Sequence, residues 1–288
     1  MNKKVALITW AGLARGTESE QLLALRLGAH GVDAPMTDWR DPSIDFGAFD
    51  LLVLRSPWDY HLREQEFCEW LGGAARRAPV LNSVQTVLWN RNKLYLRELE
   101  SRGVEIAPTC FVAGGEQPNQ HEMKRVESWT RVVVKPAVSA SAYKTWLFER
   151  EGLPLPERLA QLMQGEAFLL QEFIPEVQTQ GEISFIYIDG DYSHAVLKLP
   201  ANGDFRVQKE FGGSARLCSP PPSLVRQANE IADFVPQVRE SLYCRLDAVE
   251  RDGKLMLMEL ELIEPELFLG LAEGAAERLA EAIVKRMR

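Results

Sequence analysis

The stretch Lys254-Leu-Met-Leu-Met-Glu-Leu-Glu-Leu-Ile-Glu264 decides how this sequence is interpreted. Its second half alternates acidic and apolar residues, and successive side chains of a strand point to opposite faces. Glu259 and Glu261 therefore share one face, with leucines on the other. The run 243–250 precedes it, and the turn residues Arg251-Asp252-Gly253 separate the two runs. This pattern predicts an antiparallel hairpin with an acidic face.

The register of this hairpin decides which acidic residues meet. We expect a three-residue loop, because the glycine of the turn suits the left-handed position that such a loop requires. This loop pairs Glu250 with Lys254. Counting back along both strands places Asp247 diagonally next to Glu259, with Arg245 on the same face. A two-residue loop would move Asp247 to the opposite face.

Three carboxylates on one face have two interpretations. Burying them without partners would cost several kcal/mol. Mg²⁺ resolves this cost, because it takes oxygen ligands and shares them with the phosphates of a substrate. Alternatively, the carboxylates lie on a solvated face and pair with Arg245 and Lys254. The spacing leaves both interpretations open.

Upstream of the hairpin, strands alternate with helices over residues 1 to about 85. The pattern predicts strands at 5–9, 32–34, 50–56 and 79–82, and helices at 18–29 and 63–77. Such alternation is typical of a doubly wound parallel sheet. The first strand is not followed by G-x-G-x-x-G, and the chain contains no G-x-x-x-x-G-K-[ST]. Neither a dinucleotide fingerprint nor a P-loop is therefore expected.

The remainder of the chain changes to an antiparallel pattern. We expect helices at 90–102, 155–164, 224–240 and 273–287, an extended segment at 104–109, and strands at 130–135 and 168–173. A first hairpin is expected at 183–188 and 192–199, followed by a strand at 205–209. Parallel layers followed by hairpins predict the fold class α/β and α+β.

Composition argues against several classes of protein. The 288 residues are 46% hydrophobic, which is enough for about two domains. The net charge of −8 argues against a nucleic-acid partner, which requires a basic face. No signal peptide or membrane span is apparent, and the four cysteines and four histidines are scattered. We expect a cytoplasmic protein without a membrane partner, and neither a redox enzyme nor a metal hydrolase.

Several isolated residues have a phosphate-binding interpretation and a plainer one. Lys135 ends a buried strand, where a lysine either extends to solvent or reaches a phosphate. The loop 136–144, with Ser139 and Ser141, is either a surface turn or a cover for phosphates. Arg206 suits bidentate binding of a carboxylate or phosphate, but an ordinary strand and turn also explains it.

The order of these segments resembles the ATP-grasp superfamily. The segments that carry the resemblance are Trp89-Asn-Arg-Asn-Lys-Leu-Tyr-Leu96, Val-Val-Val-Lys-Pro136, Leu-Leu-Gln-Glu-Phe-Ile174, Gly-Glu-Ile-Ser184, Phe-Arg-Val-Gln208, Gly-Gly213, Arg-Leu-Asp247 and Met-Glu-Leu-Glu261. Each motif is weak alone, but the ordered set is specific and covers residues 86 to 270. Within the superfamily the chain most resembles the cycloserine-biosynthesis cyclo-ligase group. That likeness rests on Arg-Ser-Pro-Trp-Asp-Tyr-His61, Lys-Pro-Ala-Val-Ser-Ala140, Ser-His-Ala-Val-Leu-Lys198 and Glu-Leu-Glu-Leu-Ile-Glu-Pro265.

The resemblance implies an ATP-grasp fold with an N-terminal Rossmann-like pre-ATP-grasp domain. That domain would span 1–88, and the ATP-grasp domain 89–288, with a small lobe at about 109–174 and a C-terminal antiparallel-sheet lobe at about 175–288. The residues implied to bind ATP are Lys93, Lys135, Ser139, Ser141, Gln171, Glu172, Ile174, Glu182 and Lys198. Asp247, Glu259 and Glu261 would bind two Mg²⁺ ions, and Arg206 and Arg245 would stabilise the transferred phosphoryl group.

Two features depart from the superfamily pattern. The last metal position is often asparagine in the superfamily, and here it is Glu261. The loop over the phosphates lacks the usual glycines.

The resemblance also implies a reaction. ATP would phosphorylate a small carboxylate, and a nitrogen nucleophile would attack the acylphosphate, either within the same molecule, as in cycloserine formation, or from a second one. The alternatives are an intermolecular ligase that joins an amino acid to an amine or peptide, and an ATP-binding regulatory protein without chemistry. Candidate substrate contacts are Arg55, Ser56, Gly212 and Gly213. A homodimer is a candidate assembly by analogy alone.

Overall fold

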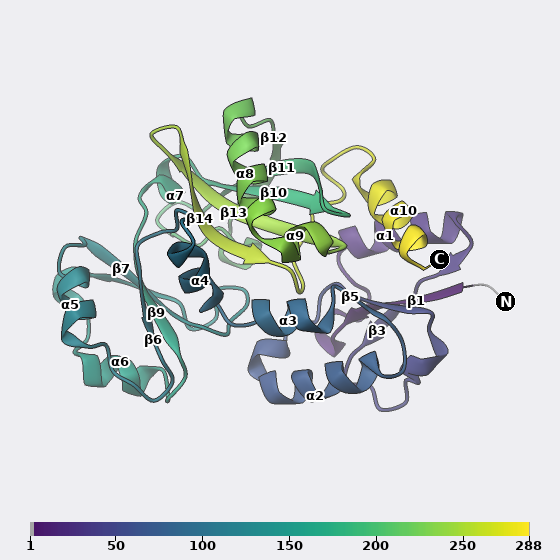
Figure 1. Ribbon diagram of the computed structural model, residues 1–288, viewed down its shortest axis with the longest axis horizontal. Helices are drawn as coiled ribbons and strands as arrows, with labels where there is room; N and C mark the ends of the chain where they lie inside the picture. The colour runs from purple at the N-terminus through teal and green to yellow at the C-terminus, as the bar shows by residue number, and fades with distance from the viewer. Residues whose placement is uncertain (1–2, 288) are drawn as a thin grey trace.

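Three β-sheets organise the chain, as Figure 1 shows. The computed structural model describes residues 3–287. The first sheet is parallel in the order β2-β1-β4-β5, with β3 also beside β1, and it confirms the expected doubly wound layer. Its elements are β1 (Lys3–Thr9), α1 (Glu18–Ala29), β2 (Val32–Asp33), β3 (Met36–Asp38), β4 (Leu51–Leu54), α2 (Glu64–Ala75), β5 (Val80–Leu81) and α3 (Val84–Asn90).

The second sheet is antiparallel, in the order β6-β9-β7-β8. Its segment contains α4 (Tyr95–Ser101), β6 (Thr109–Val112), α5 (Gln120–Val126), β7 (Arg131–Pro136), β8 (Trp146–Glu149), α6 (Pro156–Leu162), β9 (Phe168–Glu172) and α7 (Glu176–Thr179). The predicted strands at 130–135 and 168–173 are confirmed. Strands β6 and β8 were not predicted, because each has four residues and too few alternations to give a periodic signal.

The third sheet holds both hairpins, in the order β12-β11-β10-β13-β14. Its segment contains β10 (Glu182–Ile188), β11 (Asp191–Leu199), β12 (Ser214–Cys218), α8 (Pro222–Phe234), α9 (Pro236–Glu240), β13 (Tyr243–Arg251), β14 (Lys254–Glu261) and α10 (Ala275–Arg286). The single helix predicted at 224–240 is wrong. It breaks at Val235, because a residue before proline disfavours the helical conformation.

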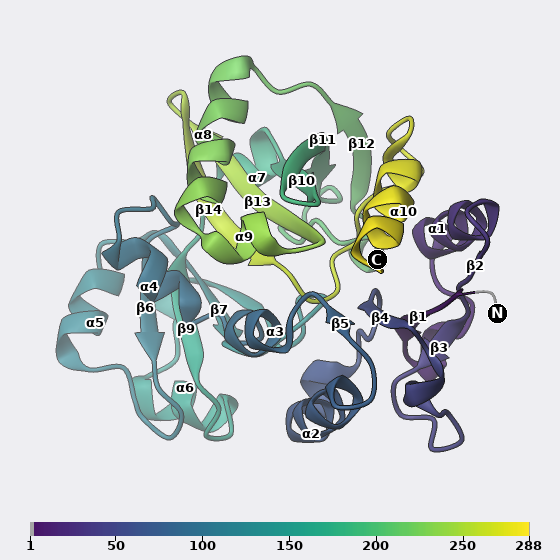
Figure 2. The ribbon, with the colours of Figure 1, turned by 45° about the vertical axis from the view of Figure 1, so that its right-hand side comes forward.

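The last helix returns to the first sheet. Helix α10 lies beside α1 in both ribbon views (Figures 1 and 2). Leu279 and Ile283 of α10 share one core with Leu27 of α1 and Val5 of β1. The C-terminal helix therefore joins the N-terminal layer to the third sheet. None of the helices within residues 3–287 has the length and apolar composition to cross a bilayer.

The strand predicted at 205–209 is wrong. The side chain of Asp204 accepts hydrogen bonds from the main-chain N–H groups of Phe205 and Arg206, at 2.7 and 2.9 Å. Such a local bond curls the chain and competes with pairing in a sheet. The segment continues into a short 3₁₀ turn at Lys209–Phe211, and β12 takes the edge position instead.

His194 on β11 is buried and neutral in this fold. Its Nε2 bonds to the carbonyl of Leu267 at 3.0 Å, and burial lowers the pKa of the ring from 6.5 to about 4. Between pH 6.5 and about pH 4, His194 therefore binds a proton in the unfolded chain but not in the folded chain. Stability should fall as pH falls through this window, by about 2 kcal/mol at pH 5.

The change His194→Gln keeps a donor for Leu267 but removes the titration. Urea unfolding at pH 7 and pH 5 should show a smaller loss of stability for this variant than for the wild type. His121→Gln, at an exposed position, is the matched control. Equal losses in wild type and His194→Gln would contradict the assignment.

Candidate active site

The acidic hairpin forms, but its register differs from the prediction. The turn has two residues, since Arg251 pairs with Lys254. Asp252 and Gly253 both have positive φ, 53° and 78°, which a two-residue hairpin turn requires. A bulge at Met258 then shifts the register between Asp247 and Ala248. This extra residue turns the side chains back, so Asp247 lies directly opposite Glu259.

The same register places Arg245 opposite Glu261. The four side chains therefore share one face, as predicted, although the predicted loop and the predicted partners were wrong. The two errors cancel, because one residue fewer in the turn and one residue more in the strand restore the face.

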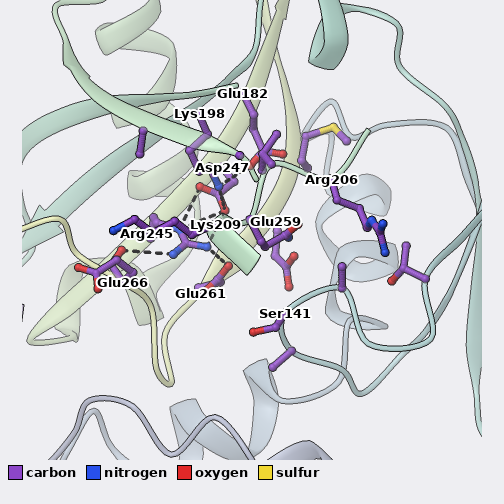
Figure 3. A pocket seen from close by; sticks show the side chains of 18 of the residues that line it. Ser141, Glu182, Lys198, Arg206, Lys209, Arg245, Asp247, Glu259, Glu261 and Glu266 are labelled. Atoms are coloured by element: carbon purple, nitrogen blue, oxygen red, sulfur yellow. Dashed lines mark hydrogen bonds and ion pairs between the residues drawn. The ribbon is translucent and has the colours of Figure 1, made fainter. Parts of the chain in front are cut away.

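Cations surround the carboxylate of Asp247 (Figure 3). Arg245 Nη2 lies 3.0 Å from it and Lys198 Nζ lies 2.9 Å from it, while Ser184 donates its hydroxyl. Burial alone would raise the pKa of Asp247, but Arg245 and Lys198 outweigh burial and lower it. Asp247 therefore stays ionised in the interior.

The neighbouring carboxylates share these cations. Lys198 Nζ also pairs with Glu182, and Arg245 also pairs with Glu261. Burial raises the pKa of Glu261 despite Arg245, and the charge of Glu259 adds to the rise. The site is thus a compact network of alternating charges that carries more acid than base.

Side chains from outside the sheet hold the free edge of β14. The amide of Asn90 donates to Leu260 O and accepts from Leu262 N, both at 2.8 Å. The hydroxyl of Tyr95 also bonds both main-chain groups of Leu260, at 2.9 and 2.8 Å. These bonds fix the backbone on either side of Glu261, and neither residue was identified from the sequence.

Lys93 lies between these two anchors. The helix predicted at 90–102 is wrong at its start, because α3 ends at Asn90 and α4 begins at Tyr95, which leaves Lys93 in the connecting turn. Its Nζ lies 3.1 Å from Glu259 and donates to the carbonyl of Ser139 at 2.6 Å. Lys93 therefore joins the acidic hairpin to the loop after β7.

A cavity of about 570 Å³ opens between the second and third sheets and the edge of the first. Its walls include most residues that the resemblance implied: Lys93, Lys135, Ser139, Ser141, Gln171, Glu172, Ile174, Glu182, Lys198, Arg206, Gly213, Arg245, Asp247, Glu259 and Glu261. Gln171 is buried and donates its amide to Thr109 Oγ1 at 3.0 Å. Burial lowers the pKa of Lys135, while Glu259 acts to raise it.

The loop over this cavity reaches its shape without glycine. Ser141, Ala142 and Lys144 all have positive φ, between 48° and 54°. Left-handed backbone costs a residue with a side chain about 1–2 kcal/mol. Residues with side chains and strained backbone thus take the places of the glycines that the superfamily pattern has in this loop. The contact between Lys93 and Ser139 helps to hold the loop in this conformation.

Three predicted substrate contacts do not line the cavity in this structure. Arg55 and Ser56 are buried beneath it, since β4 ends in the core. Arg55 Nη2 bonds to Glu20 and to the carbonyl of Pro265, both at 3.1 Å, and so supports the cavity from below. Gly212 is absent from the walls, although Gly213 lines them.

The two arginines predicted to act together lie apart. Arg206 points away from the acidic cluster in Figure 3. Its guanidinium pairs with Asp204 at 2.8 Å and stacks on Phe211, 3.6 Å from the ring centre. Of the two arginines, Arg245 reaches the carboxylates in this conformation and Arg206 does not.

The carboxylates fit a hard divalent cation by their chemistry. Asp247, Glu259 and Glu261 are oxygen donors on one face, which is the ligand type that Mg²⁺ prefers. Their oxygens are bound by Arg245, Lys93 and Lys198, and no three acidic, histidine or cysteine side chains within residues 3–287 converge on a metal position. Binding an ion would therefore require these ion pairs to rearrange.

The far end of the cavity contains residues that the sequence did not identify. Thr17 and Ser19, at the start of α1, line it together with Tyr60, Glu264 and Glu266. Glu266 accepts hydrogen bonds from both hydroxyls and from Phe268 N. The only sequence signal was the acidic continuation Glu264-Pro-Glu266 beyond the hairpin.

Comparisons with known proteins show what the chain as a whole resembles. A family model described as the N-terminal domain of D-cycloserine synthetase DcsG matches residues 5–82. The cycloserine biosynthesis protein DcsG of Streptomyces lavendulae is 29% identical over 276 residues, which cover 90% of each chain. The crystal structure of D-cycloserine synthetase DcsG superposes with a TM-score of 0.86 and 26% identity, covering 99% of this chain and 100% of that one.

A third likeness extends the fold beyond that group. The ATP-grasp ligase PsnB, solved with a precursor variant, Mg and ADP, has a TM-score of 0.65 at 16% identity and full coverage of both chains. The chain has the ATP-grasp fold and is a ligase. The acidic hairpin of this ATP-grasp ligase and the opposing lysines thus lie in a fold that binds Mg and ADP in at least one other protein.

Proposed function

We propose that this ATP-grasp ligase transfers the γ-phosphoryl group of ATP to the carboxylate of a small molecule. The observation that carries the proposal is the cavity itself. On one wall it presents Asp247, Glu259 and Glu261, and Lys93 and Lys135 also line it. Anionic and cationic groups around one space suit a metal-bound triphosphate, whose transfer needs positioning and charge neutralisation more than a protein nucleophile.

Each part of the cavity has a role in this proposal. Gln171, Glu172 and the backbone at Ile174 hold the adenine, and Glu182, kept in place by Lys198, holds the ribose. Lys93, Lys135 and the loop of Ser139 and Ser141 contact the phosphates. The three hairpin carboxylates hold two Mg²⁺ ions, which supply charge neutralisation at the transferred phosphate when bound.

The reaction has two balanced steps. A carboxylate oxygen of the substrate bonds to phosphorus as the bond to ADP breaks, and Arg245 is placed to offset the charge of the acylphosphate. A nitrogen then attacks the carbonyl carbon, loses a proton, and phosphate leaves. The loop 136–144 and the segment around Arg206 would exclude water from the intermediate. We also propose the division into a pre-ATP-grasp domain at 1–88 and an ATP-grasp domain at 89–288.

The test is ADP release from ATP and Mg²⁺ in the presence of candidate carboxylates. O-ureido-D-serine is compared with a panel of amino acids, each alone and with added amines. The products are identified by mass spectrometry. Release with one compound alone and a cyclic product supports ring closure, whereas release that requires an added amine supports the intermolecular ligase. Tight ATP binding with no ADP release for any carboxylate would overturn the proposal in favour of a regulatory protein.

A further inference from the structure

The end of the cavity formed by α1, the segment after β4 and the segment after β14 is acidic. Its wall residues are Thr17, Glu18, Ser19, Trp58, Tyr60, Ile263, Glu264, Glu266, Phe268, Gly270 and Leu271. Among them are three carboxylates and no lysine, arginine or histidine. This end of the cavity is thus complementary to a positive group.

The three carboxylates differ in their surroundings. Glu18 is exposed, so water satisfies it. Glu266 accepts hydrogen bonds from Ser19, Thr17 and Phe268 N. Glu264 is only 9% exposed, and its carboxylate has no hydrogen bond or salt bridge within residues 3–287. Glu264 lines the cavity and has no donor among the described residues, so it is the group in this wall that is free to accept hydrogen bonds from a ligand.

The main chain holds Glu264 in this position. Trp58 donates its indole N–H to the carbonyl of Glu264 at 3.0 Å, and the next residue, Pro265, accepts from Arg55. Burial raises the pKa of the Glu264 carboxyl to about 8; the charges of Glu261 and Glu259 add to the rise, and the charges of Lys93 and Arg245 oppose it without cancelling it. This unfavourable ionisation is what a cationic ligand would relieve.

The hydroxyl of Tyr60 is the second unused group. Tyr60 lines the same wall, is 3% exposed, and its hydroxyl makes no hydrogen bond to any described residue. Burial raises its pKa, and Glu264 is the charge that adds most to the rise. The hydroxyl therefore stays protonated, and it can accept an N–H while donating to a carboxylate.

We propose that Glu264, together with the hydroxyl of Tyr60, binds the amino group of the substrate, so that this ligase selects amino-bearing carboxylates. The inference rests on the proposed function, because the carboxylate to be phosphorylated must lie at the neighbouring hairpin. An ammonium group has N–H donors and a positive charge, and the Glu264 carboxylate has no partner in the described part of the chain that supplies either. Trp58 and Phe268 in the same wall exclude water and strengthen this contact.

The test compares substrates with and without the amino group. ADP release is measured for O-ureido-D-serine against 3-(ureidooxy)propionate, D-serine against 3-hydroxypropionate, and D-alanine against propionate. In the wild type, the active amino compound should exceed its partner by about 10- to 100-fold in kcat/KM. In Glu264→Gln this ratio should fall to within about threefold, and Glu264→Asp should recover part of it. Tyr60→Phe should lower the ratio less than Glu264→Gln does.

The matched control is Glu273→Gln, an exposed carboxylate outside the cavity, which should leave the ratio unchanged. A misfolded variant would lower both members of a pair, so the ratio separates recognition from structural damage. Equal ratios in wild type and Glu264→Gln would overturn the inference while the ligase activity stands. Absence of ADP release from every compound, with ATP still bound, would overturn the proposed function instead.

Discussion

The change Glu259→Gln should lower ATP-dependent turnover by about a thousandfold or more. Within residues 3–287, Glu259 has a single ion-pair partner, Lys93. Glutamine keeps its size but removes the negative charge, and a metal ion that stabilises charge in the transition state is worth several kcal/mol. ADP release at saturating ATP and Mg²⁺, with the best carboxylate of the panel, measures the loss.

The fold should tolerate this change. The side chain of Glu259 is 28% exposed, and Lys93 keeps its bond to the carbonyl of Ser139. The melting temperature should therefore change little. Glu250→Gln, on the partner strand of the same hairpin, should leave both turnover and stability intact. Full turnover in Glu259→Gln would show that the hairpin is not part of the active site.

The change Arg245→Gln should abolish turnover and also destabilise the fold by about 3–5 kcal/mol. Arg245 is the common partner of Asp247 and Glu261, and its Nη1 also donates to the carbonyl of Glu266 at 3.2 Å. Its removal leaves buried carboxylates without their main counter-charge, which is the costly way to break a buried ion pair. Urea unfolding and ADP release measure the two effects.

Arg251→Gln is the matched control, because Arg251 lies on the same strand and pairs with Glu176 at the surface. A surface pair contributes about 1 kcal/mol or less, so this variant should keep most of its stability and activity. If Mg²⁺ binds between the carboxylates, raising its concentration should restore part of the stability of Arg245→Gln. Equal stability of the two variants would contradict the buried network.

The sequence predicts the acidic face well and its geometry poorly. Alternation along 254–261 indicates which side chains share a face, because the period of a strand is two. It contains no signal for the bulge at Met258 or for the two-residue turn, since Gly253 fits either turn. The correct face was therefore reached through an incorrect register.

Residues that act from other elements were the hardest to predict. Asn90 and Tyr95 hold the edge of β14 from more than 160 positions away in the chain. Arg55 looks like a binding residue at the end of a strand, but the packing of α1 and Pro265 against it buries its guanidinium. Such roles depend on tertiary contacts, which neither periodicity nor local propensity encodes.

Arg206 shows a second reason why the site could not be predicted from the sequence. Arg206 has the residue type that suits phosphate binding, but its partner in the structure is Asp204, two residues away. This local pair curls the segment that the sequence pattern predicted as a strand. A change of loop conformation would have to precede any contact between Arg206 and a phosphate.

The most direct test of the acidic hairpin as a metal–triphosphate site is a crystal structure with ADP and Mg²⁺. We expect metal ions about 2.0–2.1 Å from carboxylate oxygens of Asp247, Glu259 and Glu261, with Arg245 turned from these oxygens toward the transferred phosphate. We also expect the adenine to lie against residues 171–174. Two results would contradict the assignment of the hairpin as a metal–triphosphate site. One is a nucleotide bound elsewhere; the other is a structure with bound Mg²⁺ in which the three carboxylates still pair with Arg245, Lys93 and Lys198.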